Sequence, residues 1–149
     1  MQLACPECGT RNRVLEQRLR DGPKCGSCAA PLAPDEPVAV RGEQLAAYVA
    51  GTEQPVLVDF WAAWCGPCRA MAPAFAAAAR LRPDVRFVKV DTDAAPEISQ
   101  QHAIRGIPTL IVFEHGREKA RVSGAMSTQQ LVAWLDAHLL SPGSRATGT

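Results

Sequence analysis

Residues 59–68 read DFWAAWCGPC and join a strand-like segment to a helix-like one. The run at 56–61 is almost entirely apolar, which is typical of a central strand covered on both faces. The segment at 67–81 is rich in alanine and predicts a helix with a kink at Pro73. Cys65 and Cys68 therefore fall between a buried strand and the first turn of a helix.

A cysteine pair at this junction is suited to disulfide exchange. Only a thiolate attacks a disulfide, and the unpaired N–H groups and dipole of a helix N-terminus stabilise a thiolate at Cys65. Cys68 follows one turn later, where it can attack a mixed disulfide formed by Cys65. We expect Cys68 to be the more buried thiol, with the higher pKa. Pro67 lies in the first turn, where its missing N–H costs little.

Two other interpretations of the pair stay open at this stage. The cysteines can be core residues that happen to be spaced by two. They can also bind a metal, but a metal site needs further ligands. The three histidines are distant in the sequence and lack the spacing of paired ligands: His102, His115 and His138.

Predicted strands and helices alternate on both sides of this stretch. We expect strands at 38–40, 56–61, 85–90, 107–113 and 119–122, and helices at 44–50, 67–81 and 97–102. Ser127 and Gln130 form a capping-box pattern for a last helix that runs to about Leu140. This order predicts an α/β fold with a mixed central sheet flanked by helices. Such folds place their chemistry at the C-terminal ends of parallel strands.

The composition excludes several classes of protein. The chain has 149 residues and a formal net charge of +1, unlike strongly basic nucleic-acid binders. It has no apolar run long enough to cross a membrane, and its N-terminus does not resemble a secretory signal. We therefore expect a cytoplasmic protein with no membrane partner. In that compartment, six cysteines indicate metal or redox chemistry rather than structural disulfides.

Four of the six cysteines lie near the N-terminus, as two C-x-x-C pairs separated by sixteen residues: Cys5, Cys8, Cys25 and Cys28. This spacing is typical of a tetrahedral thiolate zinc site. The segment is poor in apolar residues, so one zinc ion would supply the cross-link that its fold needs. Two disulfides are the alternative, which a reducing cytosol disfavours. We expect no bound organic cofactor.

These patterns divide the chain into four parts. We expect a zinc-ribbon module at 1–33, a linker at 34–37 within the proline-rich stretch 29–37, a main domain at 38–140 and a disordered tail at 141–149. The ribbon has five basic and three acidic residues, but no aromatic residue that stacks on bases. We therefore expect no nucleic-acid partner.

The stretch at 59–68 closely resembles the active site of the thioredoxin family. The resemblance covers about residues 38–140 and also rests on Pro73, Lys89, Gly124 and the segment Ile107-Pro108-Thr109. It implies a thioredoxin fold and reduction of disulfides in target proteins. A partner, an NADPH-dependent thioredoxin reductase, would then restore the dithiol. With its ribbon, the chain resembles the second, zinc-containing class of bacterial thioredoxins, and we expect a monomer.

The resemblance also assigns roles around the cysteines. Trp64, Gly66 and Pro67 belong to the active-site motif. A substrate groove is expected at Trp64, Ile107, Pro108 and Gly124, with a cis bond before Pro108. Asp59 is expected to be buried, with a raised pKa, and to exchange a proton with Cys68, while Lys89 steadies its charge.

Each of these residues also has a simpler interpretation. Asp59 can face water at a strand end, and Lys89 can be a solvated lysine at a sheet edge. Pro108 can follow an ordinary trans bond, the usual state before proline. Trp61 and Trp64 can both be core residues, although we interpret only Trp61 as core. The ribbon can be no more than a structural cap.

A different class of function is open as well. A redox-regulated chaperone or sensor would lose zinc on oxidation and expose apolar surface. In the family that the chain resembles, the Gly66-Pro67 dipeptide favours a reductase over an oxidase or isomerase. Replacing Cys65 with serine would inactivate a reductase but spare a zinc-gated chaperone.

Overall fold

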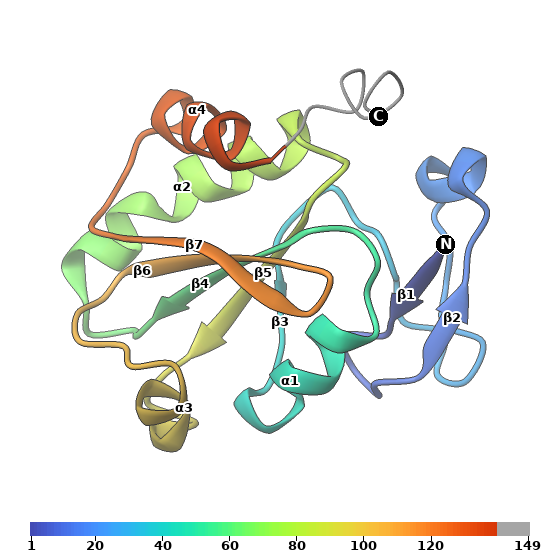
Figure 1. Ribbon diagram of the computed structural model, residues 1–149, viewed down its shortest axis with the longest axis horizontal. Coiled ribbons are helices and arrows are strands. Elements are labelled where there is room, and N and C mark those ends of the chain that lie inside the picture. Colours follow the sequence, from blue (N-terminus) through green and yellow to red (C-terminus); the bar gives the residue numbers. More distant parts are fainter. Residues whose placement is uncertain (140–149) are drawn as a thin grey trace.

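A mixed five-stranded sheet forms the centre of the molecule in this computed structural model, which describes residues 1–139 (Figure 1). The strands are β3 (Val38–Ala39), β4 (Val56–Trp61), β5 (Arg86–Asp91), β6 (Thr109–Glu114) and β7 (Arg117–Ser123). Their order is β3-β5-β4-β6-β7. The first three run parallel, β6 is antiparallel to β4, and β7 is antiparallel to β6. The central position of β4 accounts for its nearly uniform apolar sequence.

Four helices cover the two faces of this sheet: α1 (Gly42–Ala50), α2 (Gly66–Leu81), α3 (Pro96–Gln101) and α4 (Thr128–His138). Side chains of α1 and α3 pack with Val58 and Phe60 of β4 in one core. Side chains of α2 and α4 pack with Leu57 of β4 in a second core. Figure 1 shows α2 and α4 on one side and α1 and α3 on the other. Alternate residues of β4 thus serve opposite cores, so the predicted flanked sheet is confirmed.

The expected elements lie within a few residues of their predicted positions, including those of the last hairpin. β7 begins at Arg117 rather than near residue 119. His115 and Gly116 form a two-residue turn with φ of 55° and 78°, and this backbone matches the twist of paired strands. The capping box is confirmed, because Gln130 N–H donates to Ser127 Oγ and Ser127 N–H donates to the Gln130 side chain. Leu140 and the predicted tail at 141–149 lie outside the described residues.

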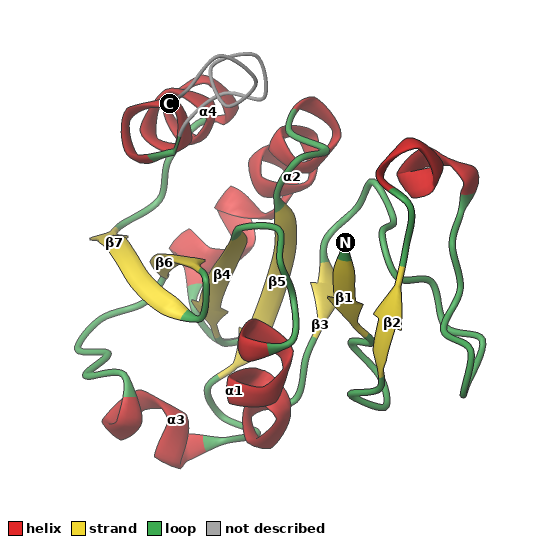
Figure 2. Ribbon diagram, turned by 45° about the vertical axis from the view of Figure 1, so that its right-hand side comes forward, coloured by secondary structure: helices red, strands yellow, loops and turns green. Residues whose placement is uncertain are grey.

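The N-terminal segment folds as a small unit beside the sheet (Figure 2). It contains a hairpin of β1 (Gln2–Ala4) and β2 (Arg11–Arg13) and a 3-10 helix at Glu16–Asp21. Its own core consists of five buried residues, two of which are cysteines: Leu3, Cys5, Val14, Cys25 and Leu32. A core this small agrees with a unit that needs a cross-link.

This ribbon packs against the end of α1 and the loop that leads into β4. Glu53 N–H donates to the Gln2 carbonyl (2.9 Å), and Ala4 N–H donates to Thr52 Oγ1 (3.3 Å). Ala4 is buried within the core shared by α1 and the sheet. The contact lies before the first residue of β4, whereas Cys65 follows its last residue. The ribbon therefore sits at the opposite end of β4 from the cysteine pair.

Among residues 1–139, no helix has both the length and the apolar character needed to cross a bilayer.

Candidate active site

Cys65 is the N-cap residue of α2 and forms a disulfide with Cys68. The Cα atoms of the two residues are 5.3 Å apart, as the C-x-x-C spacing on a first helical turn requires. Cys68 N–H donates to Cys65 Sγ (3.2 Å). Pro67 occupies the first turn, where no N–H is needed. The helix thus directs a backbone N–H at the sulfur that must carry negative charge.

The two sulfur-bearing residues are buried to nearly the same extent. Cys65 is 3% exposed and Cys68 is 2% exposed, so the expected contrast in burial is absent. Both pack with Ala62, and the partly buried Trp61 and Ile107 lie against them. These neighbours cover both sulfurs of the disulfide.

The loop before β6 lies directly beside the disulfide. The Ile107–Pro108 bond is cis, as the resemblance implied. Cys65 Sγ lies 3.7 Å from the Ile107 carbonyl oxygen. Gly124 N–H donates to the Pro108 carbonyl (2.9 Å), and Gly124 has a φ of 103°, which favours glycine. Of the expected groove residues, Ile107 therefore lies next to Cys65, whereas Gly124 contacts Pro108, and neither of these two lines the groove at Cys65.

Trp64 extends from this site into solvent, with 69% of its surface exposed. It lines a groove of about 410 Å³ together with Cys65 and Ile107. Its indole Nε1–H donates to the carboxylate of Asp93 (3.2 Å). Sequence reasoning missed Asp93, because nothing in the sequence relates it to a tryptophan 29 positions earlier. The groove therefore borders the disulfide on the Cys65 side.

Asp59 is fully buried on β4, six positions before Cys65, so the water-facing interpretation is wrong. Neither carboxylate oxygen has a hydrogen-bond partner among the described residues. Burial raises the pKa of this carboxyl to about 7, although the nearby Lys89 ammonium lowers it in part. A group with this pKa exchanges protons readily at neutral pH.

Lys89 lies beside Asp59 on the neighbouring parallel strand β5. Its Nζ is 4.4 Å from the centre of the Trp61 ring, a cation–π contact that holds the ammonium in place. Lys89 is half-buried rather than a fully solvated edge residue, since β5 lies between β3 and β4. Asp59 and Lys89 are thus paired two residues before the ends of β4 and β5, and Cys65 follows the end of β4.

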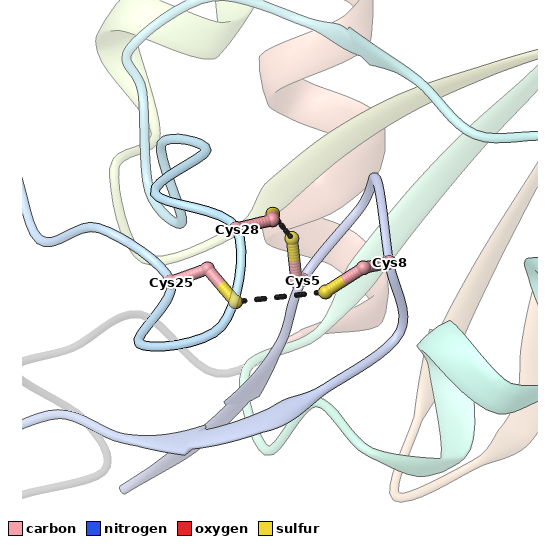
Figure 3. A group of neighbouring side chains, drawn as sticks. All are labelled: Cys5, Cys8, Cys25 and Cys28. Carbon is pink, nitrogen blue, oxygen red and sulfur yellow. Dashed lines mark hydrogen bonds between the residues drawn. The ribbon is translucent and has the colours of Figure 1, made fainter.

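The other four cysteines form a separate cluster in the ribbon (Figure 3). Their Sγ atoms all lie within 4.8 Å of one another. The closest pairs are Cys5–Cys28 (3.5 Å) and Cys8–Cys25 (3.6 Å). In a tetrahedral site with Zn–S bonds of about 2.3 Å, the sulfurs are about 3.8 Å apart. The donor set and its spacing therefore fit one zinc ion.

Each C-x-x-C pair in this cluster forms a tight turn. Gly9 N–H donates to the Cys5 carbonyl, and Ala29 N–H donates to the Cys25 carbonyl. Ser27 N–H and the Asn12 side chain donate to Cys25 Sγ at 3.4 and 3.5 Å. Such donors stabilise thiolates, the form that binds a metal.

This fold, with a disulfide at a helix N-terminus beside a cis-proline loop, defines a thiol–disulfide oxidoreductase. A family model described as "Thioredoxin" matches residues 36–137, and one described as "Thioredoxin 2, N-terminal" matches residues 4–30. The chain belongs to the thioredoxin family. The fold class predicted from the sequence is thereby confirmed.

Similar proteins cover both parts of the chain. Thioredoxin C-3 of Corynebacterium nephridii is 43% identical over 139 residues, which span 93% of this chain and 96% of that protein. Thioredoxin 1 of Synechococcus elongatus is 49% identical over 86 residues, 57% of this chain and 80% of that protein. A solved point mutant of a thioredoxin from Halobacterium salinarum superposes with a TM-score of 0.66 and 32% identity, covering 74% of this chain and 97% of that one.

Proposed function

We propose that this protein reduces disulfides in cytoplasmic target proteins, with Cys65 as the nucleophile and Cys68 as the resolving thiol. The observation that carries the proposal is the position of Cys65 Sγ. It accepts an N–H at the start of α2 and lies 3.7 Å from the Ile107 carbonyl, at the edge of the Trp64 groove. A target strand in this groove would present its disulfide to the one sulfur that the helix activates.

The reaction transfers two electrons from the dithiol to the target. The Cys65 thiolate attacks one target sulfur, the target S–S bond breaks, and a mixed disulfide forms while a target thiolate leaves. Cys68 then gives up its proton and attacks Cys65 Sγ. This step forms the Cys65–Cys68 disulfide and releases the second target thiolate.

Asp59 is the proposed acceptor of the Cys68 proton. Its raised pKa, about 7, suits transfer in either direction at neutral pH. Its buried oxygens accept no hydrogen bond from any described residue, so they are available to a proton or a water molecule. Lys89, on the neighbouring strand, places an ammonium near the Asp59 carboxylate and partly offsets the rise in its pKa.

The ribbon is proposed to bind one zinc ion through Cys5, Cys8, Cys25 and Cys28. The compact sulfur cluster supports this assignment. The bound metal would cross-link a segment whose own apolar core is small. We further propose a ribbon at 1–33, a short linker at 34–37 and a thioredoxin domain at 38–140.

The oxidised protein needs a source of electrons to turn the Cys65–Cys68 disulfide back into a dithiol. Thioredoxins are typically re-reduced by thioredoxin reductase, and we propose an NADPH-dependent enzyme of this kind as the partner that restores the dithiol for further electron transport. We propose that the protein works as a monomer in the cytoplasm.

Reduction of insulin disulfides tests this function. With dithiothreitol or a thioredoxin reductase as electron donor, the full chain should accelerate insulin reduction, and Cys65→Ser should abolish the acceleration. Cys8→Ser, outside the redox pair, serves as the matched control and should retain it. A Cys65→Ser variant that still reduces insulin would overturn Cys65 as the nucleophile, and a full chain that does not accelerate the reduction would instead support a zinc-gated chaperone or sensor.

A further inference from the structure

One side chain of the ribbon contacts the cysteine cluster without belonging to its four thiolates. Asn12 lies on β2, between the two C-x-x-C pairs, and is half-buried. Its amide makes three hydrogen bonds within the ribbon. An amide is not a usual zinc ligand, so the spacing of the cysteines along the chain gives no reason to single out this residue.

The amide of Asn12 bridges the two cysteine turns. Its Nδ2 donates to the Thr10 carbonyl (3.0 Å) and to Cys25 Sγ (3.5 Å), and its Oδ1 accepts from Gly26 N–H (3.0 Å). Thr10 closes the first turn, because Cys5 N–H donates to the same carbonyl (2.8 Å). Cys25 and Gly26 begin the second turn. One side chain therefore connects the two segments whose sulfurs a zinc ion must bind together.

The neighbours of Asn12 fix the direction in which its amide faces. A backbone carbonyl can only accept a hydrogen bond and a backbone N–H can only donate one, so Nδ2 must face Thr10 and Oδ1 must face Gly26. The second hydrogen of Nδ2 is then left for Cys25 Sγ. The backbone is fixed as well, because Asn12 pairs across the hairpin with the fully buried Leu3. The donor is thus held toward the sulfur before any metal binds.

Cys25 depends on donors from the protein. It is 4% exposed, so water supplies its sulfur with little hydrogen bonding. A metal-bound thiolate keeps negative charge, which neighbouring donors stabilise and orient. The donors to this sulfur include Ser27 N–H (3.4 Å), which belongs to the same cysteine turn, and Asn12 Nδ2, which comes from the other half of the ribbon. Asn12 therefore links the orientation of Cys25 to the position of the first turn.

We propose that Asn12 is a positioning residue of the ribbon's zinc site, which orients the Cys25 thiolate for the metal and holds the second cysteine turn beside the first. The inference rests on the proposed zinc site and adds to it a residue that is not a ligand. Nδ2 acts on the sulfur, and Oδ1 acts on the backbone at Gly26. Partners of this kind, which contact a ligand rather than the metal, typically change metal affinity by about 10–100-fold.

Competition with a chromogenic chelator measures the zinc affinity of the reduced full chain. Asn12→Ala removes all three hydrogen bonds and should weaken zinc binding by about tenfold or more. Asn12→Asp keeps the size of the side chain and the acceptor for Gly26 N–H, but it has no donor for the sulfur and its carboxylate repels the thiolate. It should therefore weaken binding at least as much. Gln17→Ala, at an exposed position of the 3-10 helix, is the matched control and should leave the affinity unchanged.

Cobalt(II) in place of zinc distinguishes an effect on the sulfur from general support of the fold. A hydrogen bond to a thiolate lowers the energy of the sulfur lone pairs, so its loss should move the sulfur-to-cobalt charge-transfer band to longer wavelength. At saturating cobalt, both Asn12 variants should show this shift and Gln17→Ala should not. A purely structural role would lower the affinity and leave the band in place.

An unmoved band, or a zinc affinity equal to that of the wild type in either Asn12 variant, would overturn the role of Asn12 and leave the zinc site standing. A wild-type chain that binds neither metal would overturn the zinc site itself, and the role of Asn12 with it.

Discussion

The chemistry of this protein depends on the difference between two neighbouring sulfurs. Cys65 lies at the N-cap, accepts the Cys68 N–H and borders the groove, whereas Cys68 lies inside the first turn of α2. Both are equally buried in the disulfide form. Position on the helix, rather than exposure, is therefore the basis of the separate roles that we propose for them.

Cys68→Ser should trap targets as mixed disulfides, because the Cys65 thiolate still attacks but nothing resolves the product. Non-reducing electrophoresis and mass spectrometry after mixing with insulin should reveal the covalent adducts. Cys65→Ser is the matched control and should trap none. Adducts that form with Cys65→Ser and not with Cys68→Ser would reverse the two roles.

Asp59 links the chemistry to stability. Its pKa rises from 3.8 to about 7 on folding because the carboxyl is buried. Between these pH values the folded state binds more protons than the unfolded state, so the free energy of unfolding falls as pH rises from about 4 to about 7. The full penalty is present above pH 7.

Asp59→Asn should remove this penalty and slow turnover, since asparagine carries no charge and accepts no proton. We expect stabilisation of about 1–3 kcal/mol at pH 8, shrinking as pH falls toward 4, by denaturant unfolding at several pH values. Asp35→Asn, at an exposed position, is the control and should change neither stability nor turnover. Unchanged turnover of Asp59→Asn at neutral pH would show that Asp59 is not the proton acceptor.

At the scale of single elements, the segment before β6 is expected to matter for the reduction of protein targets. The segment that leads into β6 brings the Ile107 carbonyl, directly before Pro108, to Cys65, and the Gly124 N–H after β7 donates to the Pro108 carbonyl. A protein target needs this segment as a docking surface, while a small disulfide needs only the sulfur.

Pro108→Ala should therefore slow the reduction of insulin more than that of a small aromatic disulfide. Rates on the two substrates, each divided by the wild-type rate, make the comparison. Thr109→Val is the control for a general loosening of the strand. It removes the hydrogen bond from Thr109 Oγ1 to the Gly106 carbonyl but leaves Pro108 in place. Equal relative losses on both substrates would mean that Pro108 serves folding alone.

The two cysteine turns of the ribbon should bind one zinc ion per chain. Cys28→Ser removes one of four thiolates and should lower the zinc content, measured by atomic absorption, well below one per chain. His115→Asn is the control, since His115 is exposed in the β6–β7 turn and asparagine tolerates its positive φ. A full complement of zinc in the Cys28→Ser protein would exclude the proposed ligand set.

At the level of the whole molecule, the ribbon is joined to the domain by more than the linker. Ala4 is buried in the domain core, and hydrogen bonds connect Gln2 and Ala4 to the loop before β4. Arg86 also donates to the Pro34 carbonyl of the linker. Yet both sheet-flanking cores and the redox site come almost wholly from residues after 37.

Deletion of residues 1–33 should leave a folded, active reductase of lower stability. The loss of Ala4 and of the hydrogen bonds at Thr52 and Glu53 is expected to cost about 1–3 kcal/mol. Thermal melting and insulin reduction of the shortened chain beside the full one make the test. A shortened chain that is unfolded or inactive would show that the ribbon is integral to the catalytic domain.

Local patterns in the sequence were sufficient to predict much of the secondary structure and the grouping of the cysteines. The strand–helix alternation and the capping box at Ser127 were correctly predicted, and the cysteines lie together as their spacing indicated, one pair as a disulfide and four as a cluster. These features depend on residues a few positions apart, and both periodicity and ligand spacing are properties of short segments. The resemblance at 59–68 added the fold and the cis bond at Pro108, which periodicity alone does not predict.

Only the tertiary structure decided the contacts between distant segments. The bond from Trp64 to Asp93, the docking of Ala4 against Thr52 and the bond from Arg86 to the Pro34 carbonyl join residues that are 29 or more positions apart. The equal burial of Cys65 and Cys68 likewise depends on what packs over them. Spacing along the chain carries no information about such neighbours, because they are set by how the sheet, its helices and the ribbon pack together.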